Sequence, residues 1–140
     1  MLASGMLNWR RPENLGVTNG RFAPCRRTPN CVSSQADPAD TEHYIAAIPF
    51  RGDAMGAVRK ALAAMPRVTI VLEKPNYLYA EFRSRLLGYV DDVEFFYDGS
   101  AIQVRSASRL GRRDFGVNRN RVERLRALLS REATAATQRP

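Results

Sequence analysis

"RVTIVLEKPNYLYAEFRS" (residues 67–84) and "YVDDVEFFYDGSAIQVRSAS" (residues 89–108) decide the fold, because each contains two strand-like runs around a turn. Apolar and polar residues alternate along all four runs, which is the period of a half-buried strand. The first turn is predicted at residues 74–76, where Asn76 tolerates a left-handed backbone. The second is predicted at Asp98–Gly99, a strong two-residue hairpin signal. The sequence therefore predicts two consecutive antiparallel hairpins.

These turns determine which residues oppose one another. The predicted pairs on the apolar side are Val68–Phe82, Ile70–Ala80 and Leu72–Leu78 in the first hairpin, and Val93–Val104 and Phe95–Ile102 in the second. Because a slip by one residue would exchange the two faces, this sorting of apolar residues supports the register. One face of the predicted sheet should therefore pack against other elements.

Helical patterns flank the hairpins. Asp53 suits the N-cap of a helix that stops at Pro66, and Asn118 suits the N-cap of a final helix. The two apolar stripes consist of Val58, Ala61, Leu62 and Met65, and of Val122, Leu125, Leu128 and Leu129. Runs of strands between helices are typical of an α+β domain. We expect an antiparallel sheet of four to five strands with two helices packed on one face, the fifth being an edge strand within residues 43–50.

The first 40 residues hold four of the eight prolines and show little periodicity. We interpret residues 1–40 as an extended arm that carries a Cys25/Cys31 loop and lies over the domain. Its expected apolar anchors are Trp9, Leu15, Val17 and Phe22. Residues 41–131 would form the α+β domain, and residues 132–140 a frayed tail.

Positive charge is concentrated in one segment. The net charge is +8, and 20 of the 22 basic residues are arginine. Residues 105–131 contain nine arginines and two acidic residues, a net charge of +7. Such a field attracts nucleic acid, anionic lipid headgroups or small phosphate and carboxylate ligands. The alternative is that these arginines are mainly solvated surface, which is the usual state of charged residues.

No stretch approaches the roughly 20 apolar residues of a spanning helix, so we expect no transmembrane segment. Contact with a membrane surface stays open. The first 16 residues also lack the basic region and apolar run of a signal peptide. We therefore expect a cytoplasmic protein, or an exported or lumenal one if a targeting segment preceded residue 1.

The two cysteines, Cys25 and Cys31, are separated by five residues in "APCRRTPNCVSS" (residues 23–34). A disulfide across this short turn is geometrically possible. Two structural thiols in a reducing compartment are the main alternative. Metal or redox chemistry is poorly supported, because zinc usually takes four ligands and the chain has one histidine.

The predicted second hairpin places polar groups at the end of its apolar face. Asp91 opposes Ser106 and Tyr89 opposes Ser108 in this register. A carboxylate and two hydroxyls there form either a satisfied polar cluster or the floor of a cavity. The cation expected to reach Asp91 is Arg109, Arg112 or Arg113.

On the opposite face, Asp92 opposes Arg105 in the predicted register. With Glu81, Glu94 and Arg83 this pair is expected to form a charged surface exposed to water. The nearby Tyr77 and Tyr79 suggest base stacking. The carboxylates would repel a phosphate backbone, however, so nucleic acid is not the expected partner.

The start of the final helix attracts anions in principle. Its positive dipole end is surrounded by Arg112, Arg113, Arg119 and Arg121. Such a site is predicted to bind an anion unless Asp114 already offsets the charge.

Catalytic patterns are scarce. The chain shows no nucleophile–base pair, phosphate-binding loop or dinucleotide fingerprint, and its one histidine is His43. We therefore predict no catalytic residue, no cofactor and no metal site. Asp91 and Asp114 are the candidates for acid–base chemistry if the protein is an enzyme.

Three segments, "PCRRTPNCVSSQA" (24–36), "LLGYVDDVEF" (86–95) and "VRSASRLGRRDFGVNRNRVERLR" (104–126), together resemble a bacterial and plastid family called domain of unknown function 1499. The resemblance extends from about residue 13 to 130, and it implies a domain type and no reaction, because that family has no assigned activity. Where family members usually read Cys-Pro-x-Ser-Pro-Asn-Cys, this chain has Arg26 and Thr28. The motif positions are Cys25, Pro29, Asn30, Cys31, Ser33, Ser34, Asp91, Asp92, Glu94, Arg105, Ser106, Ser108, Arg109, Asp114, Gly116, Asn118 and Arg121.

From these observations we predict a non-enzymatic binding or interaction domain for a small anionic or amphipathic ligand. The residues predicted to bind it are Asp91, Arg105, Ser106, Ser108, Arg109, Asp114, Asn118 and Arg121. The alternatives are an enzyme of unknown reaction that uses Asp91 or Asp114, and a purely structural domain clamped by its arm. Neither the ligand nor the oligomeric state follows from the sequence.

Overall fold

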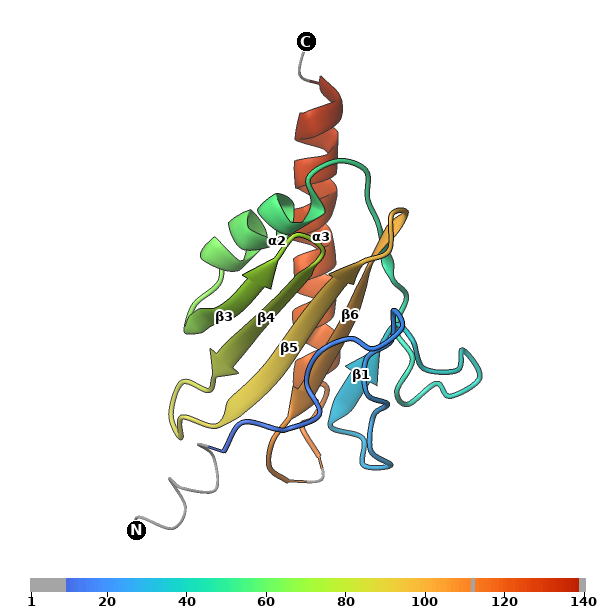
Figure 1. Ribbon diagram of the computed structural model, residues 1–140. Coiled ribbons are helices and arrows are strands. Elements are labelled where there is room, and N and C mark those ends of the chain that lie inside the picture. The colour runs from blue at the N-terminus through green and yellow to red at the C-terminus, as the bar shows by residue number, and fades with distance from the viewer. Residues whose placement is uncertain (1–9, 112, 139–140) are drawn as a thin grey trace.

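The structure, a computed structural model, describes residues 10–111 and 113–138. The elements in chain order are β1 (Cys31–Ser33), β2 (Ile48–Pro49), α2 (Ala54–Ala63), β3 (Val68–Lys74), β4 (Tyr77–Arg83), β5 (Val90–Tyr97), β6 (Ala101–Ser108) and α3 (Val117–Gln138). The strands form one antiparallel sheet in the order β1-β6-β5-β4-β3, and β2 also pairs with β6 (Figure 1). The predicted α+β class and both hairpins are confirmed.

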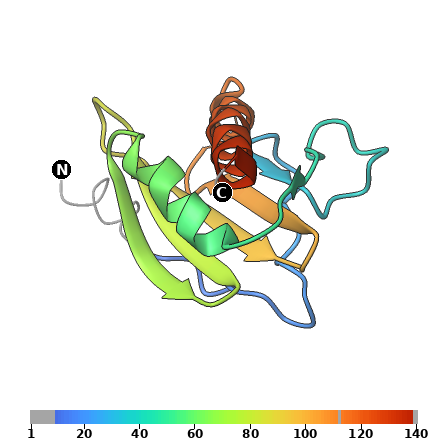
Figure 2. The same ribbon diagram turned by 90° about the horizontal axis from the view of Figure 1, so that it is seen from above.

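Both helices cover the same face of the sheet (Figure 2). Helix α2 begins after Asp53, whose Oδ1 accepts a hydrogen bond from the Gly56 backbone N–H at 3.0 Å, as an N-cap should. The predicted apolar stripe of α3 lies against the sheet, and Val122, Leu125 and Leu129 are fully buried. The core therefore lies between the two helices and the inward side chains of β4, β5 and β6.

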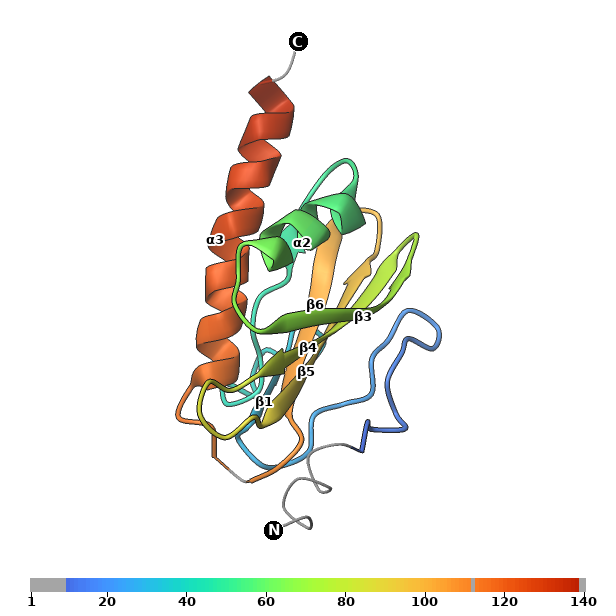
Figure 3. The same cartoon turned by 90° about the vertical axis from the view of Figure 1, so that its left-hand side faces the viewer.

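The N-terminal arm crosses the opposite face of the sheet (Figure 3). Leu15 and Val17 pack there against a small buried cluster of Phe22, Tyr77 and Tyr79. Trp9, the fourth expected anchor, lies outside the described residues. Both faces of the central strands are consequently covered, one by helices and one by the arm.

The first hairpin departs from the predicted register at a bulge. Val68 opposes Phe82 and Ile70 opposes Ala80 as predicted, but Leu72 opposes Tyr79 instead of Leu78. The register shifts between Ile70 and Leu72, which shortens the loop to Pro75–Asn76. An extra residue in one strand reverses the side-chain alternation beyond it. Leu72, beyond the shift, is exposed, and Ile70, which keeps its predicted partner, is exposed because β3 is the edge strand.

The second hairpin is shifted by two residues from the predicted pairing. Phe95 opposes Val104, not Ile102, and Asp91 opposes Ser108, not Ser106. The cause is the position of Asp98, which lies just before the turn instead of within it. Its Oδ1 accepts hydrogen bonds from the backbone N–H groups of Ser100 and Ala101 and so stabilises the turn. A shift of two preserves the alternation, so every predicted face assignment in this hairpin stands.

The predicted arm contributes to the sheet. Within it, β1 pairs with β6 and places Cys31 opposite Ala107. The edge strand expected within residues 43–50 is reduced to the two residues of β2. Helix α3 continues to Gln138, beyond the predicted end of the domain at residue 131. The division of the chain at residues 40 and 131 stays a prediction.

Candidate functional site

The polar groups predicted at the sheet end lie close together, and α3 adds the side chains of Asn118 and Arg121 to them. Arg121 Nη2 donates to Asp91 Oδ2 at 2.8 Å, and Arg121 Nη1 donates to Asn118 Oδ1 at 2.8 Å. Ser106 Oγ donates to Asn118 Oδ1 at 2.5 Å, and Asn118 Nδ2 donates to Ser108 Oγ at 2.9 Å. We call Asp91, Ser106, Ser108, Asp114, Asn118 and Arg121 the sheet-end network. The partner of Asp91 is Arg121, not Arg109 or Arg113; Arg112 lies outside the described residues.

Asn118 is not the N-cap that the sequence predicts. Helix α3 begins at Val117, so Asn118 lies in the first turn, and its side chain is fully buried against the sheet. Asp114 takes the capping role, since its Oδ1 accepts from the Gly116 N–H and its Oδ2 from the Asn118 N–H, both at 3.0 Å. The chain's own carboxylate therefore occupies the helix start that was predicted to attract an anion.

Burial raises the pKa of Asp91, and the guanidinium of Arg121 offsets this only in part. The Arg121 guanidinium also stacks on Phe82, with Cζ 4.5 Å from the ring centroid. Arg121 is therefore held from both sides, by a carboxylate and by an aromatic face.

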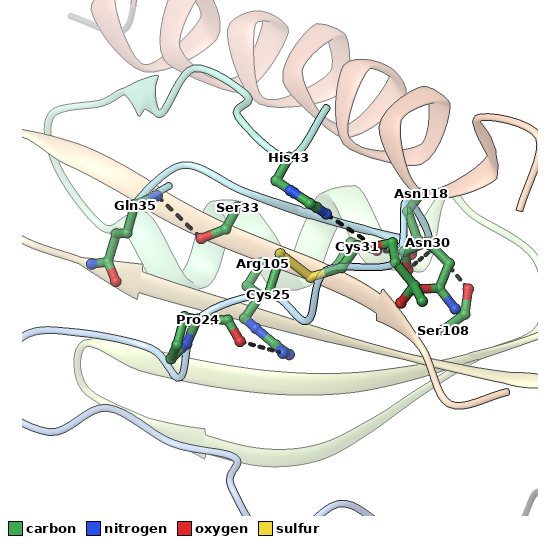
Figure 4. Close-up of a disulfide and its surroundings, with 12 residues drawn as sticks. Pro24, Cys25, Asn30, Cys31, Ser33, Gln35, His43, Arg105, Ser108 and Asn118 are labelled. Atoms are coloured by element: carbon green, nitrogen blue, oxygen red, sulfur yellow. Dashed lines mark hydrogen bonds between the residues drawn. A yellow bond between two sulfur atoms is a disulfide. The ribbon is translucent and has the colours of Figure 1, made fainter. Parts of the chain in front are cut away.

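The arm reaches the same network through Asn30. Its backbone oxygen accepts hydrogen bonds from Ser108 N at 3.0 Å and Asn118 Nδ2 at 3.2 Å (Figure 4). Its side-chain Nδ2 donates to the Gly111 oxygen at 2.7 Å. Cys31, the next residue, is disulfide-bonded to Cys25, as one of the sequence-based alternatives proposed. The short disulfide loop thus holds the loop between β6 and α3.

A pocket of about 600 Å³ opens beside the sheet-end network. Its apolar walls are Met65, Pro66, Phe82, Val90, Leu110 and Val117. Asp91, Ser108, Asp114 and Arg121 contribute polar groups to it, and its rim carries the exposed side chains of Arg67, Arg83, Arg113 and Arg124. A volume of this size lies within the range of small-molecule sites. The arrangement can accommodate an apolar body with an anionic group.

The opposite face carries a second set of charges, which we call the arm-side cluster: Arg11, Glu81, Asp92, Glu94, Arg105 and Arg109. All of their side chains except that of Arg11 are buried. Arg109 holds Asp92 through two hydrogen bonds of 2.8 Å and Glu81 through one of 2.6 Å. The Tyr79 hydroxyl also donates to Asp92. Arg11 in the arm donates to Glu81 at 2.8 Å. The prediction of a surface exposed to water is wrong for Glu81, Asp92, Glu94 and Arg105, which are buried, whereas Arg83 is exposed as predicted.

Some charged groups in this cluster have close partners of opposite charge, and others do not. Burial would raise the pKa of Glu81, but hydrogen bonds from Arg11 and Arg109 outweigh it, and the pKa is lowered. Glu94 and Arg105 approach only to 3.7 Å. Burial accordingly raises the pKa of Glu94 and lowers that of Arg105, since a long contact compensates poorly for lost water. The predicted cross-strand pair of Asp92 with Arg105 is replaced by Asp92 with Arg109.

The eight predicted ligand-binding residues therefore lie in three places. Asp91, Ser108, Asp114 and Arg121 line the pocket. Ser106 and Asn118 are buried directly behind it. The structure does not bring Arg105 and Arg109 to this pocket, because successive strand residues point to opposite faces and these two face the arm.

The model of one protein family, described as protein of unknown function (DUF1499), matches residues 21–129. The chain belongs to this DUF1499 family. No curated protein and no solved structure matches the chain significantly. The family assignment confirms the resemblance inferred from the sequence, and it assigns no activity.

The motif residues that carried the DUF1499 resemblance fall largely in the two buried networks. Asn30, Asp91, Ser106 and Asn118 belong to the helix face, and Asp92, Glu94, Arg105 and Arg109 to the arm face. What sequence reasoning missed are the apolar pocket walls, above all Met65 and Phe82. Both were assigned to the core by periodicity, and no local signal distinguishes a core residue from a pocket wall.

Over the described part of the DUF1499 chain, no helix is long and apolar enough to cross a membrane.

Proposed function

We propose that the protein is a non-catalytic binding module whose pocket at the sheet end takes a small amphipathic anion. The observation that carries this proposal is the combination of apolar walls with an arginine rim in a pocket of about 600 Å³. Such pockets are lined mainly by apolar side chains and orient a ligand by a few polar groups. An acyl or aryl body would contact Met65, Phe82 and Val90.

Charge supports an anionic headgroup. Asp91 and Asp114 are the carboxylates that line the pocket, and both are engaged, the first by Arg121 and the second by the α3 backbone. Arg113 and Arg124 lie at the rim with exposed side chains. Arginine donates paired hydrogen bonds to carboxylate or phosphate oxygens, so these residues would orient the headgroup.

The test is calorimetric titration with dodecyl phosphate, with dodecyl maltoside as a neutral amphiphile and inorganic phosphate as a headgroup without a tail. We expect dodecyl phosphate to bind most tightly. Arg113→Ala/Arg124→Ala should weaken it at least about tenfold, because each lost charge-assisted hydrogen bond is worth roughly 1.5–3 kcal/mol. Arg51→Ala/Arg131→Ala removes the same charge outside the pocket lining and should leave the affinity unchanged. Absence of binding to the unmodified protein, or equal losses in both double variants, would refute the proposal.

A second candidate function is acid–base catalysis by Asp91, which is favoured by the raised pKa of this pocket carboxyl. Against it, the 2.8 Å hydrogen bond from Arg121 favours the charged carboxylate and so opposes the rise in the pKa of Asp91. The titration of Asp91 by carbon NMR separates the two candidates. A midpoint near neutral pH would favour the enzyme, and a midpoint in the acidic range would favour the binding module.

A further inference from the structure

Three large apolar side chains project into water at one end of the molecule. Leu86 and Leu87, in the loop between β4 and β5, are 90% and 70% exposed, and Phe115, in the loop before α3, is 90% exposed. Both loops lie at the end where α3 begins, opposite the C-terminal end of that helix (Figures 1 and 3). Large exposed apolar groups gathered at one place usually mark a contact surface.

The backbone holds Phe115 in this position against its own preference. Its φ is 53°, in the left-handed region that bulky residues avoid. Asp114 supports this conformation by accepting hydrogen bonds from the N–H groups of Gly116 and Asn118, which follow Phe115. Strained conformations of this kind persist where the surrounding structure enforces them, and they concentrate at functional surfaces.

Arginines lie close to these apolar groups in the sequence, and the exposed Glu42 is, among the described residues, the one carboxylate outside the two loops that lines a pocket with Phe115. Arg85 and Arg113 are exposed in the same two loops, and Arg83 is exposed at the end of β4. Residues 83–89 contain no acidic residue, and the one in residues 110–117 is Asp114, which caps the helix. We call Leu86, Leu87, Phe115, Arg83, Arg85 and Arg113 the docking tip.

We propose that the docking tip binds the surface of an anionic lipid bilayer, with the three apolar side chains inserted among the headgroups and the arginines on lipid phosphates. Apolar side chains on short loops with arginines close by fit a bilayer interface, which takes up the apolar groups while the cations stay at the headgroups. The core of a protein–protein interface is instead depleted of charge. This inference goes beyond ligand binding, because Leu86, Leu87 and Phe115 are not among the walls of the 600 Å³ pocket.

The first experiment is co-sedimentation of the full chain with vesicles of phosphatidylcholine containing about 30% phosphatidylglycerol, compared with pure phosphatidylcholine. We expect binding to the anionic vesicles and at least about tenfold weaker binding to the neutral ones. Leu86→Ser/Leu87→Ser should reduce binding to the anionic vesicles at least about tenfold. Ile70→Ser/Leu72→Ser, which changes two exposed apolar residues on β3, should leave it unchanged.

Phe115→Gly separates docking from folding. Glycine adopts a positive φ without strain, so this variant should melt at the same or a higher temperature while binding anionic vesicles several-fold more weakly. The melt also identifies any variant that fails to fold.

Dodecyl phosphate titration of Leu86→Ser/Leu87→Ser distinguishes this inference from the proposed function, since the pocket walls are intact in that variant. Unchanged titration with lost vesicle binding supports the docking tip. The inference is overturned if the unmodified chain ignores anionic vesicles, or if the β3 variant loses as much binding as the tip variant. It is equally overturned if the unmodified protein is a dimer that the Leu86→Ser/Leu87→Ser variant does not form. The docking tip would then bind a second copy of this chain and not a membrane.

Discussion

His43 lies between two hydrogen-bond acceptors. Its Nδ1 is 2.8 Å from Asp40 Oδ2, and its Nε2 is 2.9 Å from the backbone oxygen of Thr28. Only the protonated imidazolium can donate to both. Burial lowers the pKa of His43, but the hydrogen bonds to Thr28 and Asp40 outweigh it, and the pKa is raised above 6.5. One side chain thereby ties the disulfide loop to the turn that follows β1.

At the residue scale we therefore predict a pH-dependent stability carried by His43. A group whose pKa is higher in the folded chain stabilises it fully below the unfolded value of 6.5, and the stabilisation is lost as the pH rises through the raised folded pKa. The free energy of unfolding in urea should be larger at about pH 6 than at about pH 8. In His43→Gln this difference should vanish, because His43 is the only histidine. An equal difference in the variant would contradict the assignment.

At the element scale, the disulfide loop and β1 act as one unit. Cys31 is the first residue of β1, and the loop it closes carries Thr28 and Asn30. Thr28 accepts from His43, and Asn30 bonds to Ser108, Gly111 and Asn118. Residues from three distant parts of the chain therefore depend on the shape of one short loop, whose two cysteines are six positions apart.

Reduction of this disulfide should lower the free energy of unfolding by roughly 2 kcal/mol, the loop-closure value for a short ring. The measurement is urea denaturation with and without a phosphine reductant. Cys25→Ser/Cys31→Ser is the control, and it should match the reduced protein and not respond to the reductant. Identical unfolding of the oxidised and reduced protein would show that the hydrogen bonds alone hold the loop.

At the scale of the whole molecule, the sheet is covered on both faces by unlike layers. Helices α2 and α3 bury apolar residues on one face. The arm buries the arm-side cluster on the other, where Gly16 N donates to Glu94 Oε1 at 2.7 Å. Buried charges that lose their partners are strongly destabilising. The arm therefore adds to the stability of the fold by supplying partners to these charges as well as by covering them.

We predict that Leu15→Ser/Val17→Ser releases the arm without unfolding the helix side. The loss of these half-buried apolar contacts should cost roughly 1–2 kcal/mol of unfolding free energy. Trypsin should then cleave the arm after Arg10 and Arg21 faster than in the unmodified chain, as measured by mass spectrometry of a digestion time course. Ile70→Ser/Leu72→Ser carries the same kind of change at an exposed edge and should digest like the unmodified chain. Equal arm cleavage in all three proteins would contradict the prediction that Leu15 and Val17 hold the arm on the sheet.

Much of the fold follows from short-range patterns. The Asp53 cap, the apolar stripe of α3 and the two hairpins each depend on residues close in sequence. The bulge after Ile70 does not, because it serves the packing of Val71 on the arm. All six residues of the sheet-end network were among the predicted ligand-binding residues, but the pairing of Asp91 with Arg121 was not predicted. Asp91, Ser106 and Ser108 share a face through alternation alone, whereas their partner Arg121 is recruited from α3.

The sequence by itself determined the α+β class, the two faces of the hairpins, the family and the clustering of positive charge, because periodicity, turn chemistry and motifs are local properties. Tertiary structure alone decided that Arg109 and Glu81 are buried under the arm and that Met65 and Phe82 line a pocket. Alternation shows that a strand has a polar face. It cannot show whether water or a distant segment of the chain will cover that face, since burial depends on contacts between residues far apart in sequence.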